Sequence, residues 1–112
     1  MMQYAFNPEP YEKQQFQRDA AYVVATLSGL TSDSSMRRIR GEIDWGRLYQ
    51  RKQRGDAPAM QVEHYTGSDE YHLRIGMNGQ TPESQKTATD ALVTTILGKY
   101  AMRQVHEDQA KL

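Results

Sequence analysis

The residues best suited to binding chemistry in this chain lie between Arg37 and Arg54, in the segment RRIRGEIDWGRLYQRKQR. Seven of these residues are basic, six of them arginine, and Trp45 and Tyr49 stand among them. Arginine makes forked hydrogen bonds to phosphate groups, and aromatic rings stack on exposed bases. We therefore predict a surface for nucleic acid, or for an acidic protein, with these candidate residues: Arg37, Arg38, Arg40, Arg47, Tyr49, Arg51, Lys52 and Arg54.

Charge is distributed unevenly along the chain. The formal net charge is zero, yet residues 36–55 sum to +5, whereas residues 1–35 sum to −2 and residues 56–112 sum to −3. A local excess of one sign is more informative about partners than the average charge. A simpler interpretation also stays open, in which Glu42 and Asp44 neutralise the arginines of a solvated face.

A second candidate surface lies on the first predicted helix. Tyr11, Arg18 and Tyr22 recur at i, i+7 and i+11, opposite the apolar positions of that helix. Tyrosine and arginine are enriched among the residues that dominate protein interfaces. This face and the arginines define an alternative function, a protein-binding modulator such as an adaptor or an inhibitor of a partner enzyme. In the simpler alternative, the tyrosines only cover a neighbouring loop.

The sequence offers little for catalysis. His64 falls on the apolar face of a predicted strand, His72 lies near Glu63 and Arg74 on the other face, and His106 lies in the tail. The HExxH, GxSxG and GxxxxGK patterns do not occur, and without cysteine there are no thiolate ligands or disulfides. We expect a protein that binds rather than catalyses, without a cofactor or a metal.

Two helices are predicted to position the candidate residues. The first begins at Asn7-Pro8-Glu9, in the order of cap, proline and acid, and it ends at Gly29. The last begins at Thr81-Pro82-Glu83 and ends near Gly98 or runs on to Val105. Residues 31–35 are small and polar, which is typical of a loop.

The basic segment itself fits two local structures. Alternation of Ile39, Ile43 and Trp45 with charged residues favours a strand over Arg38–Trp45. The spacing of Met36, Ile39 and Ile43 also suits a helix, which Gly41 weakens. We expect the strand, followed by a short helical turn or an extended basic arm over residues 47–54.

A β-hairpin is the clearest element. Apolar residues alternate in residues 60–64 and 73–77 around the turn Gly67-Ser68-Asp69-Glu70. If Thr66 faces Tyr71, the facing pairs are Met60 with Met77, Val62 with Ile75, His64 with Leu73, Glu63 with Arg74 and Tyr65 with His72. One face of the hairpin is then apolar, and the other carries an ion pair.

These elements predict an α+β fold in the order α-β-β-β-α, with a three-stranded antiparallel sheet and two helices packed on one face. We expect a single domain over residues 1–112, with frayed termini at 1–7 and 106–112. The last helix carries a wide apolar stripe, which predicts a homodimer through this helix. The stripe consists of Leu92, Val93, Ile96, Leu97 and Tyr100.

The N-terminal sequence has neither a basic region nor an apolar stretch typical of a signal peptide. The longest apolar run, residues 20–27, is too short to cross a bilayer. We therefore expect a soluble cytoplasmic protein that contacts no membrane. Its leading predicted function is non-enzymatic contact with nucleic acid through residues 37–54, in a regulatory role.

Overall fold

The computed structural model describes residues 1–30, 32–43, 48–52, 57–65, 67–77 and 79–105. The α+β class predicted from the sequence is confirmed, with additional helical and strand elements. In chain order the elements are β1 (Met2–Phe6), the 3-10 helix η1 (Pro10–Glu12), α1 (Lys13–Leu27), α2 (Asp33–Glu42), β2 (Leu48–Arg51), β3 (Met60–His64), β4 (Tyr71–Ile75), α3 (Glu83–Leu97) and β5 (Arg103–Val105).

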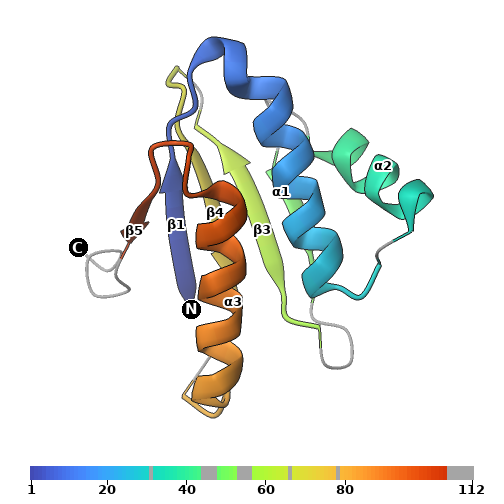
Figure 1. Cartoon of the computed structure of the whole chain (residues 1–112), viewed down its shortest axis with the longest axis vertical. Coiled ribbons are helices and arrows are strands. Elements are labelled where there is room, and N and C mark those ends of the chain that lie inside the picture. Colours follow the sequence, from blue (N-terminus) through green and yellow to red (C-terminus); the bar gives the residue numbers. More distant parts are fainter. Residues whose placement is uncertain (31, 44–47, 53–56, 66, 78, 106–112) are drawn as a thin grey trace.

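The strands form one sheet in the order β2-β3-β4-β1-β5, and every neighbouring pair is antiparallel. The two predicted helices, α1 and α3, lie side by side on one face of this sheet (Figure 1). The third helix, α2, packs against α1 on the side away from α3 (Figure 1). The fold therefore consists of a sheet, a layer formed by the helices α1 and α3, and the peripheral helix α2.

The N-terminal residues are an integral part of the sheet, so the predicted frayed terminus over residues 1–7 is wrong. Strand β1 lies between β4 and β5, and its Met2 is paired with Ile75. Tyr4 and Phe6 are fully buried. Met2, Tyr4 and Phe6 alternate with Gln3 and Ala5, which is a short strand pattern, but the position of this strand in the sheet depends on partners about 70 residues away. The other expected frayed segment, residues 106–112, lies outside the described residues.

The predicted strand over Arg38–Trp45 is also wrong, because its described residues up to Glu42 belong to helix α2. The predicted loop over residues 31–35 is wrong from Asp33 onward, because α2 begins there with Ser32 as its N-terminal cap. The Ser32 hydroxyl accepts a hydrogen bond from the Ser35 amide at 3.2 Å. Helical spacing places Ile39 in the core, and this burial outweighs the cost of Gly41, about 1 kcal/mol relative to alanine.

The hairpin has the predicted faces but a different register. Val62 is paired with Leu73 rather than Ile75, and Met60 with Ile75. The Tyr65 amide donates to the Glu70 carbonyl at 3.1 Å, so the loop closes one residue earlier on each strand than predicted. A shift of one residue on both strands moves each partner by two positions and leaves the side chains on the same faces.

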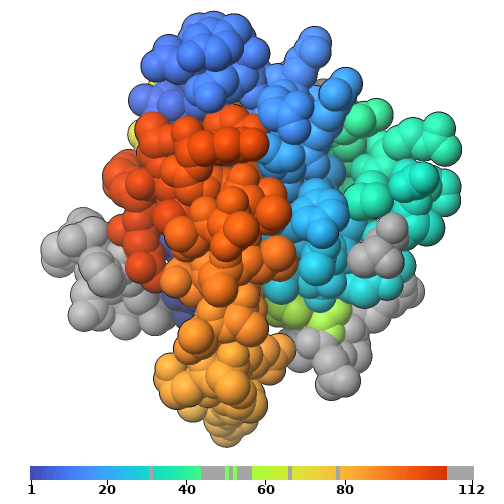
Figure 2. All heavy atoms as spheres, in the orientation of Figure 1, coloured from blue at the N-terminus to red at the C-terminus, as the bar shows by residue number. Residues whose placement is uncertain are grey.

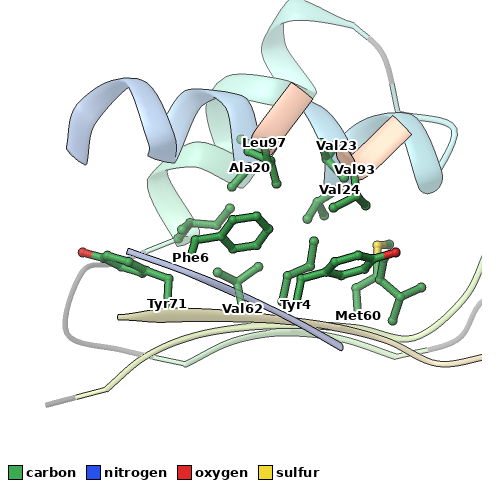
Figure 3. Close-up of a cluster of buried hydrophobic side chains, with 14 of the residues drawn as sticks. Tyr4, Phe6, Ala20, Val23, Val24, Met60, Val62, Tyr71, Val93 and Leu97 are labelled. Carbon is green, nitrogen blue, oxygen red and sulfur yellow. The ribbon is translucent and has the colours of Figure 1, made fainter. Parts of the chain in front are cut away.

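The core lies between the sheet and the layer formed by α1 and α3 (Figure 3). On α3, Val93 and Leu97 are fully buried, while Leu92 and Ile96 are partly buried against the same core. The width of the apolar stripe is thus explained by contact with both the sheet and α1. The fold needs no second copy of the chain to cover it, and the homodimer stays a prediction.

Candidate functional site

Helix α2 is held against α1 by apolar contact and by one polar side chain. Ile39 and Ile43 are buried, and Met36 is partly buried against the core. The Gln17 side-chain amide, on α1, donates to the Arg40 carbonyl at 2.9 Å and also to the Ile43 carbonyl. These contacts fix the C-terminal end of α2 and leave its arginine side chains directed away from the core.

A groove of about 580 Å³ lies between the exposed surfaces of these two helices. The surfaces of α1 and α2 adjoin on the face shown in Figure 2. Helix α1 contributes Arg18, Asp19, Ala21 and Tyr22, and helix α2 contributes Asp33, Met36, Arg37 and Arg40. The structure therefore brings residues from the two surfaces predicted separately, the basic segment and the helix face with Arg18 and Tyr22, into one groove.

The arginines of this region have no carboxylate partner within the described residues. This holds for Arg18, Arg37, Arg38 and Arg40, none of which forms an ion pair or a side-chain hydrogen bond there. Five basic residues elsewhere do form ion pairs, in Lys13–Asp69, Arg74–Glu63, Lys86–Glu83, Lys99–Asp19 and Arg103–Glu70. The groove thus presents cations whose hydrogen-bond donors remain available to a ligand.

Two carboxylates also line the groove, and they differ in their bonding. Asp19 is already occupied, because it accepts a hydrogen bond from the Tyr100 hydroxyl at 2.6 Å and pairs with Lys99 at 3.3 Å. Asp33 lies in the first turn of α2 and is exposed. The helix dipole favours a negative charge at that end. Since Asp19 pairs with Lys99, the described lining of the groove has three arginines and one carboxylate without a partner, that of Asp33.

Three of the other predicted binding residues, Arg38, Tyr11 and Lys52, are described and do not line the groove. Arg38 is exposed on α2 but does not line it, and Tyr11 lies in η1 with 85% of its surface exposed. Lys52 is exposed after β2 and lines a smaller cavity of about 220 Å³ with Arg74. In β2, the backbones of Tyr49 and Arg51 pair with Val62 and Met60. Arg47, Arg54 and Trp45 fall outside the described residues.

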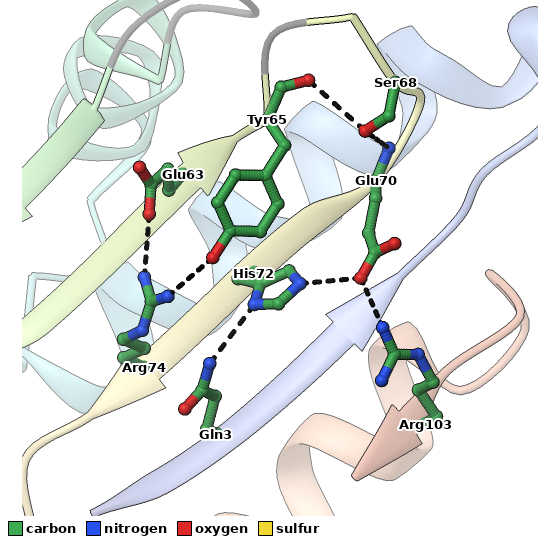
Figure 4. Close-up of polar contacts among 8 residues, drawn as sticks. All are labelled: Gln3, Glu63, Tyr65, Ser68, Glu70, His72, Arg74 and Arg103. Carbon is green, nitrogen blue, oxygen red and sulfur yellow. Dashed lines mark hydrogen bonds and ion pairs between the residues drawn. The ribbon is translucent and has the colours of Figure 1, made fainter. Parts of the chain in front are cut away.

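The polar face of the sheet carries two hydrogen-bonded groups instead of the predicted contact among Glu63, His72 and Arg74 (Figure 4). Arg74 donates to Glu63 and to the Tyr65 hydroxyl, both at 2.9 Å. His72 contacts the Gln3 amide at 3.2 Å and Glu70 at 2.7 Å. The predicted Glu63–Arg74 ion pair is confirmed, on a diagonal of the hairpin rather than directly across it.

These hydrogen bonds connect neighbouring strands of the sheet. The hydrogen bond from His72 lowers the pKa of the Glu70 carboxyl, and Arg103 on β5 contributes to the same shift. His64 contacts the Ser68 carbonyl at 2.7 Å and stacks on Tyr71. His106 lies outside the described residues. No cluster of three or more potential metal ligands occurs among the residues that the structure describes.

The signal that could have located the groove is the start of α2. Ser32 and Asp33 precede apolar residues at Met36, Ile39 and Ile43, which is a cap followed by helical spacing. A helix there places Arg37 and Arg40 one turn apart on one face. What the sequence could not show is that this face would lie opposite Arg18 and Tyr22.

Comparisons with protein-family models, curated proteins and solved structures each found no match to this chain. Within the described residues, no helix combines the length and the apolar character that a bilayer span requires.

Proposed function

We propose that this protein is a non-enzymatic binding protein that contacts nucleic acid through the groove between α1 and α2. The observation that carries the proposal is the set of arginines on these two helices without carboxylate partners in the described structure. An arginine directed into solvent with its donors unused is suited to phosphate oxygens, which accept two parallel hydrogen bonds from one guanidinium.

The arrangement of the cations supports a polyanion rather than a single small anion. Arg37 and Arg40 lie one helical turn apart on α2, and Arg18 lies on the opposite helix. Arg38 extends the positive surface beyond the groove. Charges spread over two helices match a ligand that carries phosphates at intervals along a chain.

A protein partner is the second candidate, and the exposure of two tyrosines favours it. Tyr11 is 85% exposed and Tyr22 is 45% exposed. Tyrosine is a frequent anchor of protein interfaces, so both side chains are available to a partner. A surface of that kind depends on a few aromatic and arginine residues and responds only weakly to salt. The two candidates therefore differ in a measurable way.

The test is the salt dependence of binding, measured by fluorescence anisotropy with labelled single-stranded and duplex oligonucleotides. Each phosphate contact contributes a log–log slope of about −0.7 on single strands, so three groove arginines give a slope of about −2. A steep loss of affinity between low and physiological salt supports the proposal. Absence of binding at the lowest salt would refute it and leave the protein-partner candidate in the lead.

A further inference from the structure

We propose that the groove between α1 and α2 takes single-stranded nucleic acid, with one base stacked on Tyr22 and the adjoining phosphates held by Arg18, Arg37 and Arg40. This inference rests on the proposed function and specifies its ligand class. It commits to an unpaired strand, and the sugar, deoxyribose or ribose, is distinguished by the experiment below.

Tyr22 differs from the buried tyrosines of the fold. Tyr4 and Tyr100 are buried, and their hydroxyls donate to Asp90 at 2.8 Å and to Asp19 at 2.6 Å. Tyr22 lines the groove with 45% of its surface exposed, and its hydroxyl has no hydrogen-bond partner in the described structure. Its ring is therefore available for stacking, which every base can accept because every base has a planar face.

The position of the cations relative to this ring matches an unpaired nucleotide. Arg18 precedes Tyr22 by one turn of α1, while Arg37 and Arg40 lie on the facing helix. A base placed on the ring therefore has guanidinium groups available from both helices for the phosphates on either side of it. Arginine also stacks on bases, which adds to the contact.

A duplex does not use these features. Its bases are stacked on one another and expose only their edges in the grooves, so an aromatic ring in a recess finds no free base face. The groove volume, about 580 Å³, lies in the range of about 300–1,000 Å³ that is typical of sites for small ligands. It therefore has the size of a site for one or two nucleotides.

The free carboxylate in the groove is compatible with a bound base. Asp33 would repel a row of phosphates, but a carboxylate accepts hydrogen bonds from the amino groups of bases, as it does from cytosine. An unpaired base offers both N–H donors of its amino group, whereas a Watson–Crick pair leaves one of them free in the major groove. One carboxylate beside three arginines is thus consistent with a site that holds a base as well as phosphates.

The experiment compares three labelled probes of equal length at low salt: a mixed-sequence DNA strand, the same sequence as RNA, and a hairpin duplex. We expect the protein to bind one or both single strands more tightly than the duplex. Tyr22→Ala should weaken single-strand binding by about 5- to 150-fold, the usual effect of losing one stacked base, and Tyr22→Phe should preserve it. Stronger binding of either single strand supports the inference and identifies the sugar.

The matched control is Tyr65→Ala, which removes another partly exposed tyrosine from the polar face of the sheet, where its hydroxyl bonds to Arg74. It should bind as the unchanged protein does, and circular dichroism should show that both alanine variants are folded. Equal affinity for duplex and single strands, with Tyr22→Ala unchanged, would overturn this inference and leave the proposed function standing. Absence of binding to all three probes would overturn both.

Discussion

The substitution Val62→Asp is expected to leave the protein unfolded at room temperature. Val62 is 3% exposed on β3 and packs in the core between the sheet and the two covering helices (Figure 3). A carboxylate at this position would be buried without a partner, which costs several kcal/mol. The whole stability of a domain is about 5–15 kcal/mol, so this single change removes most or all of it. Far-ultraviolet circular dichroism and thermal melts measure the effect.

The neighbouring residue supplies the matched control. Glu63 lies on the opposite face of β3, where its carboxylate pairs with Arg74 at 2.9 Å and remains about one-third exposed. Glu63→Ala should lower the free energy of unfolding by less than about 1 kcal/mol, as is usual for partly exposed ion pairs. If Val62→Asp melted cooperatively at a temperature close to that of Glu63→Ala, the faces of the hairpin would be assigned incorrectly.

The double substitution Arg37→Glu with Arg40→Glu is expected to abolish oligonucleotide binding. It removes two of the three guanidiniums in the described lining of the groove and adds two carboxylates to the one of Asp33. Like charges facing each other cost several kcal/mol, so affinity at low salt should fall at least about a hundredfold. The log–log salt slope of any remaining binding should become less negative by about 0.7 for each lost contact. Anisotropy titrations provide both quantities.

A pair of single charge reversals separates the groove from net charge. Arg37→Glu and Lys86→Glu alter the charge of the protein equally, and each lies on a helix surface, but Lys86 lies on α3 and already pairs with Glu83 at 3.6 Å. Arg37→Glu should weaken binding strongly, and Lys86→Glu should have little effect. Equal losses would mean that binding reflects overall charge and not the groove.

The elements that the sequence predicted well are those whose signal is local. The hairpin alternates along β3 and β4, and α1 and α3 each carry a helical apolar stripe, so their existence and their faces agree with the structure. Strand β1 depends instead on long-range pairing with β4 and β5. The alternation of Met2, Tyr4 and Phe6 could have indicated a strand, but no local pattern shows which strands it pairs with.

The basic segment shows the second limit of the sequence. Ile39 and Ile43 are compatible with a strand and with a helix, because a spacing of four residues matches both periods. Contact with α1, including the hydrogen bonds from Gln17, selects the helix. The groove exists because this segment is a helix. The sequence therefore identified Arg37 and Arg40 as candidate binding residues, but it did not show that they share a groove with Arg18 and Tyr22.

The most direct test of the account is a map of backbone amide chemical shifts in nuclear magnetic resonance spectra, recorded while a short single-stranded oligonucleotide is added at low salt. We predict that the largest changes cluster at residues 18–22 of α1 and 33–40 of α2, the two stretches that contain the residues lining the groove. Amides on the polar face of the sheet, around His72 and Arg74, should change little (Figure 4). Spectra that do not change, or changes centred on that face of the sheet, would contradict the assignment of the groove as the binding site.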